Sequence, residues 1–208
     1  MSTKKTIIAL LLVVIFAFSV LLISFSDMQN EIADKLIRLH IPANSDSAFD
    51  QNVKLAVRDA VCELLSEKLK NANDRKNAQN IITENLDTIK KTADDVLKKS
   101  KVAYTSKVTL CTENFDTRVY DDFTLPAGKY ESLRITLGNG VGHNWWCVVF
   151  PPICAKAAES TDYAELYFTE DELSVIKNND EGVQIRFKLF ELTSKIKENL
   201  SDILEELK

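Results

Sequence analysis

The stretch KLIRLHIPANSDS, residues 35–47, decides the fold because it joins a strand pattern to the start of a helix. Ile37, Leu39 and Ile41 alternate with polar residues, which is the period of a strand with one apolar face. Pro42 has no N–H group for a sheet ladder, so we expect the strand to end there. The Asn, Ser and Asp residues that follow favour turns and helix caps. The stretch therefore predicts a strand, a short turn and a capped helix.

The predicted helix runs from about Ala48 to Lys70. The side chain of Ser45, Asp46 or Ser47 could accept a hydrogen bond from the first N–H groups of this helix. Its apolar residues fall on one stripe, which comprises Phe49, Val53, Val57, Ala60, Val61 and Leu64. This stripe predicts that one side of the helix is buried.

A second helix is predicted after residues 71–73, which interrupt the helical pattern. Asn73 or Asp74 can cap it, and it continues to about Lys99. Its apolar stripe comprises Ala78, Ile82, Leu86, Ile89, Ala93, Val96 and Leu97. Two amphipathic helices joined by a short turn form a hairpin that needs one more surface to cover its apolar side.

Strand patterns follow the second helix. Leu133, Ile135 and Leu137 alternate with polar residues, and WWCVVF, residues 145–150, has the composition of a further strand. The patterns predict an α+β fold, in which the helical hairpin packs on a small, mainly antiparallel sheet of three to five strands. Apolar residues at helical spacing between residues 189 and 207 add a C-terminal amphipathic helix. It would pack on the domain's own core or, alternatively, on a partner.

The N-terminal segment, residues 1–26, has a different composition. Two lysines precede an uncharged apolar run, Ile7–Phe25. As a helix, this run would span roughly 29 Å, close to the hydrocarbon thickness of a bilayer. Ser24 and Ser26 are small residues of the kind that a signal peptidase requires. We expect a signal peptide or a transmembrane anchor here, followed by a single extracytoplasmic α+β domain over residues 27–208.

The charge of the chain limits its partners. Without residues 1–26 the chain has 24 basic and 31 acidic residues, a net charge of −7, and no basic patch stands out. Proteins that bind nucleic acids neutralise phosphates with Lys and Arg, and a polybasic surface does the same at anionic membranes. We therefore expect no nucleic-acid partner, and membrane contact only through the N-terminal segment.

Both tryptophans and two of the four cysteines lie in GHNWWCVVFPPIC, residues 142–154. Trp145 and Trp146 point to opposite sides of a strand, so one should be buried and the other should face outward or cover a second surface. A tryptophan that is exposed would be our first candidate for an anchor to a partner. A disulfide between Cys147 and Cys154 requires the chain to reverse at the Pro-Pro pair between them. We expect this bond to close a local loop, with a contribution of at most about 2.5 kcal/mol in the chain-entropy model.

No pattern of catalytic residues stands out. A thiol oxidoreductase needs C-x-x-C at a helix N-terminus, which Cys147 and Cys154 do not form. With only His40 and His143 as histidines, a zinc site is not expected. GNGVG, residues 138–142, precedes a strand, whereas a phosphate loop precedes a helix, so it predicts a flexible or tightly turned connection between strands. We expect no catalytic residue, metal, cofactor or small-molecule substrate. The alternative is an extracytoplasmic thiol-dependent hydrolase or cell-wall enzyme.

A polar group surrounds the junction of the first strand and helix. Arg38 and His40 lie on the polar side of the strand, and Asn44, Ser45 and Asp46 lie in the turn. Helix capping and a solvated strand face would account for them, and the alternative is a recognition surface. Together with the two tryptophans, these five residues are our candidates for an interaction surface.

Two long segments resemble a known family. RLHIPANSDSAFDQNVKLAVRDAV, residues 38–61, and PAGKYESLRITLGNGVGHNWWCVVFPPIC, residues 126–154, are similar to the stage II sporulation protein R family of endospore-forming bacteria. The R-x-H…A-N-S-D, V-R-D-A-V and N-W-W-C…F-P-P-x-C elements occur in the family's order, and the resemblance covers roughly residues 30–155. Pro42 departs from the family pattern, which would have an aliphatic residue there. This departure concerns the backbone pairing at the end of the strand.

The resemblance implies a function that composition does not. Proteins of this family are made in the forespore and exported into the space between the forespore and mother-cell membranes. There they activate a membrane-embedded aspartic protease, which then removes the pro-sequence of sigma factor E. By this resemblance the chain is a secreted or N-terminally anchored signalling ligand, its partner is the protease, and it has no catalytic role of its own.

Overall fold

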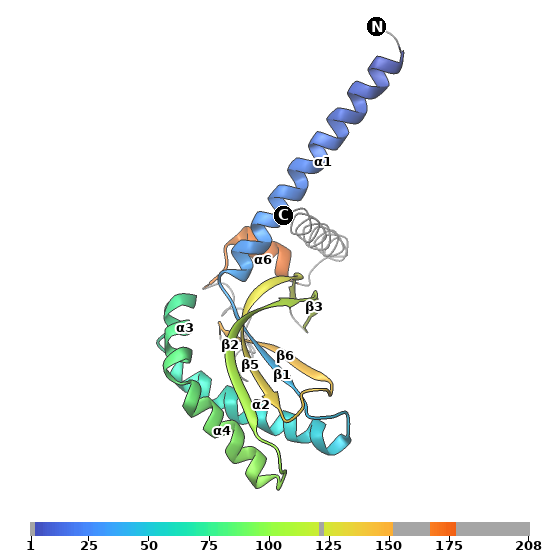
Figure 1. Ribbon diagram of the computed structural model, residues 1–208. Helices are drawn as coiled ribbons and strands as arrows, with labels where there is room; N and C mark the ends of the chain where they lie inside the picture. The colour runs from blue at the N-terminus through green and yellow to red at the C-terminus, as the bar shows by residue number, and fades with distance from the viewer. Residues whose placement is uncertain (1–2, 121–122, 152–166, 178–208) are drawn as a thin grey trace, which may run out of the picture. The chain divides into compact units, whose positions relative to one another are not determined.

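The structure, a computed structural model, describes residues 3–120, 123–151 and 167–177 (Figure 1). The chain divides into two units. The sheet unit comprises Ala33–Asn114 and Lys129–Leu173, and the terminal unit comprises Met1–Ile32, Phe115–Gly128 and Ser174–Lys208.

The sheet unit is built on a sheet with the strand order β2-β5-β1-β6 among the described residues. The strands are β1 (Ile37–Pro42), β2 (Ser106–Phe115), β5 (Gly128–Leu137) and β6 (Asn144–Phe150). β1 is antiparallel to β6 but parallel to β5, so the sheet is mixed. The prediction of a mainly antiparallel sheet is therefore corrected on this point. Alternation of polar and apolar residues identifies the two faces of a strand, but it does not give the direction of the neighbouring strand.

β1 includes Pro42, which is paired in register with Asn144 of β6. Because β6 is antiparallel to β1, this pair lies where β1 ends and β6 begins. A proline is tolerated at such a position, because its missing N–H group costs the sheet little backbone hydrogen bonding there. The departure from the family pattern at this residue therefore leaves the strand pairing intact.

Helices α2 (Ala48–Lys68), α3 (Arg75–Glu84) and α4 (Leu86–Lys99) lie against one face of the sheet (Figure 1). Ser47 caps α2 and Asp74 caps α3, both within the predicted sets. The second predicted helix is divided at Asn85, whose side-chain amide donates to the carbonyl of Ile81 at 2.8 Å. Asparagine competes for backbone groups in this way, which favours a break within a helix.

The core lies between these helices and the sheet. Ile37, Leu39 and Ile41 are fully buried, as are Leu133, Ile135 and Leu137, and all six were predicted to face inward. They pack against the helix residues Val53, Val57, Val61, Leu65, Ala78, Ile82, Ile89, Ala93 and Leu97. Burial of each large aliphatic side chain contributes about 1.5–3 kcal/mol. Phe49 was predicted to join this stripe, and this is wrong, because its side chain is 57% exposed.

The terminal unit contains most of α1 (Thr3–Ala33) and an antiparallel pair, β3 (Arg118–Val119) and β4 (Thr124–Leu125). Within the described residues, no helix combines the length and apolarity that a membrane crossing requires. The assignment of residues 1–26 as signal peptide or anchor, and of residues 27–208 as one domain, stays a prediction.

The described chain after β6 contains a short helix, α6 (Glu170–Ile176). The predicted C-terminal amphipathic helix, between residues 189 and 207, lies outside the described residues, as does Cys154.

Candidate functional site

Two loops meet at one edge of the sheet. β1 and β5 are parallel, so the loops that follow them begin at the same edge. We call residues 43–47 the cap loop and residues 138–143 the glycine loop. The N–H of Gly142 donates to the carbonyl of Ala43 at 2.9 Å, and the N–H of Asn139 donates to Oδ1 of Asn44 at 3.0 Å. The two segments that carry the family resemblance are thus joined directly.

The glycine loop has its conformation because three positions exclude a side chain. Gly138 and Gly140 have φ values of +54° and +65°, in the left-handed region that glycine adopts without strain. A Cβ atom at Gly142 would overlap the backbone of Ser45. Of the two predicted forms, a flexible or a tightly turned connection, the structure has the tight turn. The close approach to the cap loop explains the third glycine.

The cap loop is fastened to α2 by Asp50, which is only 7% exposed. Its carboxylate accepts hydrogen bonds from Ser45 Oγ at 2.5 Å, Tyr104 OH at 2.6 Å and Asn44 Nδ2 at 2.9 Å. These donors, Ser45 first, hold the pKa of Asp50 below its usual range. Asn44 and Ser45, predicted as capping or recognition residues, therefore use their side chains in hydrogen bonds to Asp50, and the helix cap itself is Ser47.

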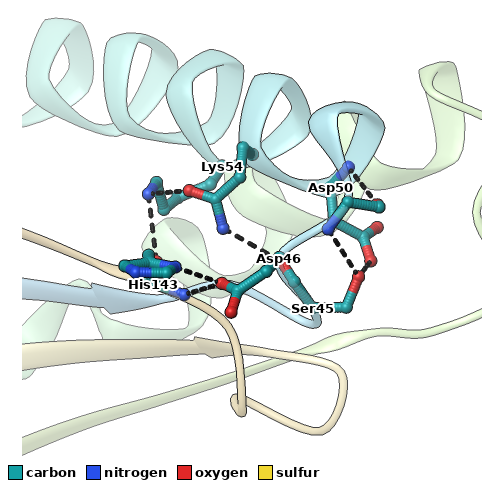
Figure 2. Close-up of polar contacts among 7 residues, drawn as sticks. Ser45, Asp46, Asp50, Lys54 and His143 are labelled. Atoms are coloured by element: carbon teal, nitrogen blue, oxygen red, sulfur yellow. Dashed lines mark hydrogen bonds and ion pairs between the residues drawn. The ribbon is translucent and has the colours of Figure 1, made fainter.

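Asp46 joins the cap loop to the glycine loop at the surface (Figure 2). Its Oδ1 accepts a hydrogen bond from the N–H of His143 at 2.6 Å, and Nδ1 of the His143 ring contacts the same oxygen. The backbone N–H of His143, followed by its ring, holds the pKa of Asp46 below its usual range. The side chain of His143 is 80% exposed and that of Asp46 is 57% exposed. This pair is the solvent-facing part of the joined loops.

Lys54 of α2 supports the pair from the buried side. Its Nζ donates to the carbonyl of His143 at 3.0 Å and to Oε1 of Gln51 at 2.6 Å (Figure 2). Burial lowers the pKa of Lys54, and the nearby Asp46 carboxylate opposes this effect. A carbonyl held by a buried ammonium group has little freedom to move, so the backbone at His143 is fixed from both sides.

Arg38 and His40 do not reach the surface. They lie on the sheet face opposite the helices, with exposures of 0% and 5%. The guanidinium of Arg38 lies 4.9 Å from the ring centroid of Tyr130. Alternation suggested a solvated face for both residues, whereas the structure buries them. They therefore do not present their polar groups to a partner in this conformation.

The His40 ring is held on two sides. It stacks on Trp146 with ring centroids 3.7 Å apart, and its Nδ1 lies 3.2 Å from both carboxylate oxygens of Glu113. Glu113 also accepts a hydrogen bond from Arg134 at 3.0 Å. Burial lowers the pKa of His40, and Glu113 acts in the opposite direction. The imidazole is therefore neutral at pH 7 and serves as packing.

The two tryptophans point to opposite faces of β6, as predicted. Trp145 packs at the border of the helix-covered core, with the Arg58 guanidinium 4.3 Å from its ring centroid, and Trp146 stacks on His40. Both side chains are half-buried, so neither tryptophan is fully buried or exposed, and Trp146 covers a second surface, which was one of the expected arrangements. The reason is that polar side chains, Arg58 on one face and His40 on the other, cover part of each ring.

The cysteines bear on the hydrolase alternative. Cys62 and Cys111 are free thiols. Burial raises the pKa of Cys62 to about 11, and burial together with Glu113 raises that of Cys111. A thiolate is the reactive form, so neither residue is a good nucleophile near pH 7. Because Cys154 lies outside the described residues, the Cys147–Cys154 disulfide stays a prediction.

Several residues of the site were missed from the sequence. The sequence pattern indicated only a strand at Tyr104 and only a helix at Lys54. No local sequence pattern connects Tyr104 to Asp50. His143 was noted only as a histidine, although it adjoins the NWWC element. Among the described residues, no group of three or more His, Cys, Asp or Glu side chains could hold a metal ion. The arrangement fixes exposed side chains on a rigid support, which suits recognition.

Comparisons with known proteins agree with the resemblance. A family model described as stage II sporulation protein R matches residues 33–160, which include both loops. The curated stage II sporulation protein R of Bacillus subtilis (strain 168) is 42% identical over 123 residues, which are 59% of this chain and 55% of that protein. The chain thus spans about half the length of the curated relative that it matches. No solved structure is significantly similar to it.

Proposed function

Since the chain belongs to the stage II sporulation protein R family, we propose that it is an exported sporulation signal that activates a membrane-embedded aspartic protease. The activated protease removes the pro-sequence of sigma factor E. Residues 1–26 carry the rest of the chain out of the forespore into the intermembrane space, where it is secreted or stays anchored. The chain contacts the membrane through this segment.

The observation that carries the proposal is the junction of the two loops. Both loops lie in the segments that resemble the family, and together they hold Asp46 and His143 in fixed, exposed positions. A surface that is ordered before binding loses little conformational entropy when a partner binds. A ligand requires such a surface, whereas an enzyme requires a reacting group.

The chemistry of the described residues supports a ligand without catalytic activity. The thiols of Cys62 and Cys111 have raised pKa values, which disfavours the reactive thiolate form. The protein then acts only through binding. A ligand activates a protease by binding its active form more tightly than its inactive form. A tenfold shift of that equilibrium needs a preference of about 1.4 kcal/mol.

A processing assay tests the proposal. The full chain would be produced in a heterologous bacterium together with the protease and the sigma factor E precursor, and cleavage would be followed by immunoblot. We expect cleavage with the full chain, and none when the chain lacks residues 1–26 and stays in the cytoplasm. Equal cleavage with and without the protein, at confirmed export, would show that it is not the signal.

A further inference from the structure

Two large apolar side chains are exposed beside the joined loops. Phe49, in the first turn of α2, is 57% exposed, and Val141, in the glycine loop, is 75% exposed. Val141 directly precedes Gly142, whose N–H donates to Ala43, and Phe49 directly precedes Asp50, which holds Ser45. Both side chains therefore extend from the backbone that the loop contacts fix in place.

The backbone that carries these two side chains is held by close contacts and hydrogen bonds. The glycines on both sides of Val141 leave no room for a Cβ, because one would meet Thr136 and the other Ser45. The carboxylate of Asp50 accepts three side-chain hydrogen bonds, and its N–H donates to Ser47 Oγ. An exposed apolar side chain on a backbone that is already ordered can contact a partner at a low cost in conformational entropy.

Exposed polar groups accompany the two apolar side chains. Asp46 and His143 are exposed and hydrogen-bonded to each other. An apolar centre with a polar rim is the general anatomy of a protein–protein interface. We call the exposed side chains of Asp46, Phe49, Val141 and His143 the loop surface.

We propose that the loop surface is where this protein binds the extracytoplasmic part of the protease. This rests on the proposed function and adds the location of the contact. The counterpart on the protease is an apolar patch next to a cationic side chain, because the loop surface pairs apolar groups with the Asp46 carboxylate. The chain has a net charge of −5, which steers it towards a basic partner.

A matched pair of substitutions tests the location. Val141 and Val119 are both 75% exposed, but Val119 belongs to β3 in the terminal unit. In the processing assay with the full chain, we expect Val141→Asp to reduce cleavage at least tenfold and Val119→Asp to leave it unchanged. Val141→Ser is the second variant, in case the carboxylate disturbs folding. Each variant would be checked for wild-type circular dichroism before its cleavage is compared.

The outcomes separate the two proposals. If the wild-type chain causes no cleavage, the proposed function fails. If it causes cleavage and both Val141 variants do so equally well, only the loop surface is overturned. Equal losses from Val141→Asp and Val119→Asp would also overturn it, because the effect would not depend on the position of the charge.

The chemistry of the counterpart has its own test, with the detergent-solubilised protease as the probe. We expect the apparent Kd of the wild-type chain to rise with salt concentration, and to rise less for Asp46→Asn. If the apparent Kd of Asp46→Asn depends on salt as strongly as that of the wild type, the proposed cationic side chain on the protease is contradicted. If the wild-type chain is a dimer in solution and Val141→Asp makes it a monomer, the surface binds a second copy, and the proposal is wrong.

Discussion

The helix-covered face of the sheet and the loop surface are both connected to β1 and β5, but apolar side chains are buried in the first and exposed in the second. On the sheet face, Leu39 and Leu133 are paired in register and fully buried. Beyond the ends of the same strands, Phe49 in the first turn of α2 and Val141 in the glycine loop are exposed on a closely hydrogen-bonded backbone. The buried leucines are explained by their contribution to stability. The exposed pair is not explained in this way. The difference therefore separates residues that maintain the fold from residues that are available for contact.

The largest effect on stability is expected on the sheet face. Leu39→Ala leaves a cavity among residues that are fully buried, and such substitutions cost about 2–5 kcal/mol. Urea unfolding of wild type and variant would measure this difference. A loss below about 1 kcal/mol, smaller than that whole range, would mean that β1 is not at the centre of the core.

A smaller loss is expected where the cap loop is fastened. Asp50→Ala leaves Ser45, Asn44 and Tyr104 without their acceptor, which costs about 1–3 kcal/mol. Asp87 is the matched control, because it lies in the first turn of α4 but is exposed. Unfolding in urea should be affected by Asp50→Ala and hardly at all by Asp87→Ala. Equal effects would show that charge at a helix start, and not the hydrogen bonds, is what matters.

The buried His40 predicts a pH dependence. Because burial lowers its pKa in the folded state, the unfolded chain takes up the proton first, near pH 6.5, as pH falls. Stability therefore decreases below pH 6.5, by at most about 1.4 kcal/mol per pH unit for this one proton, until His40 itself titrates in the folded state. His40→Asn should lack this decrease between pH 6.5 and 5.5, as measured by urea unfolding at each pH. An unchanged slope in that variant would assign the effect to other groups.

The smallest effect on stability is expected at the loop surface. Phe49→Ser removes a side chain that is 57% exposed, so the free energy of unfolding should change by no more than about 0.5 kcal/mol. The same variant should be impaired in the processing assay. A stability loss as large as that of Leu39→Ala would place Phe49 with the core residues and remove the contrast between the two regions.

Much of the sheet face was predictable from the sequence. The alternation of Ile37, Leu39 and Ile41 identified the buried side of β1, and the run of Asn, Ser and Asp located the start of α2. These features depend on neighbouring residues only. The parallel pairing of β1 with β5 was missed because strand direction depends on the path of the intervening chain.

The candidate site was less predictable. Asn44, Ser45 and Asp46 were named, but Asn139 and His143, which donate to Asn44 and Asp46, lie 95 and 97 residues away in the chain and carry no local signal. Arg38 and His40 were expected at the surface because polar residues usually face solvent. Their burial depends on contacts of the folded sheet, such as the stack on Trp146 and the bond to Glu113. Phe49 had the helical spacing of a core residue, and only the structure shows that it is exposed.

The most direct test of a signalling ligand that acts through the loop surface is to measure cleavage of the sigma factor E precursor against the amount of folded, exported protein. Wild type, Leu39→Ala and Phe49→Ser would be compared over a range of expression levels. We expect Leu39→Ala to fall on the wild-type curve, because it lowers only the amount of folded protein. We expect Phe49→Ser to lie below that curve at every level. If all three proteins fall on one curve, the loop surface has no part in the signal.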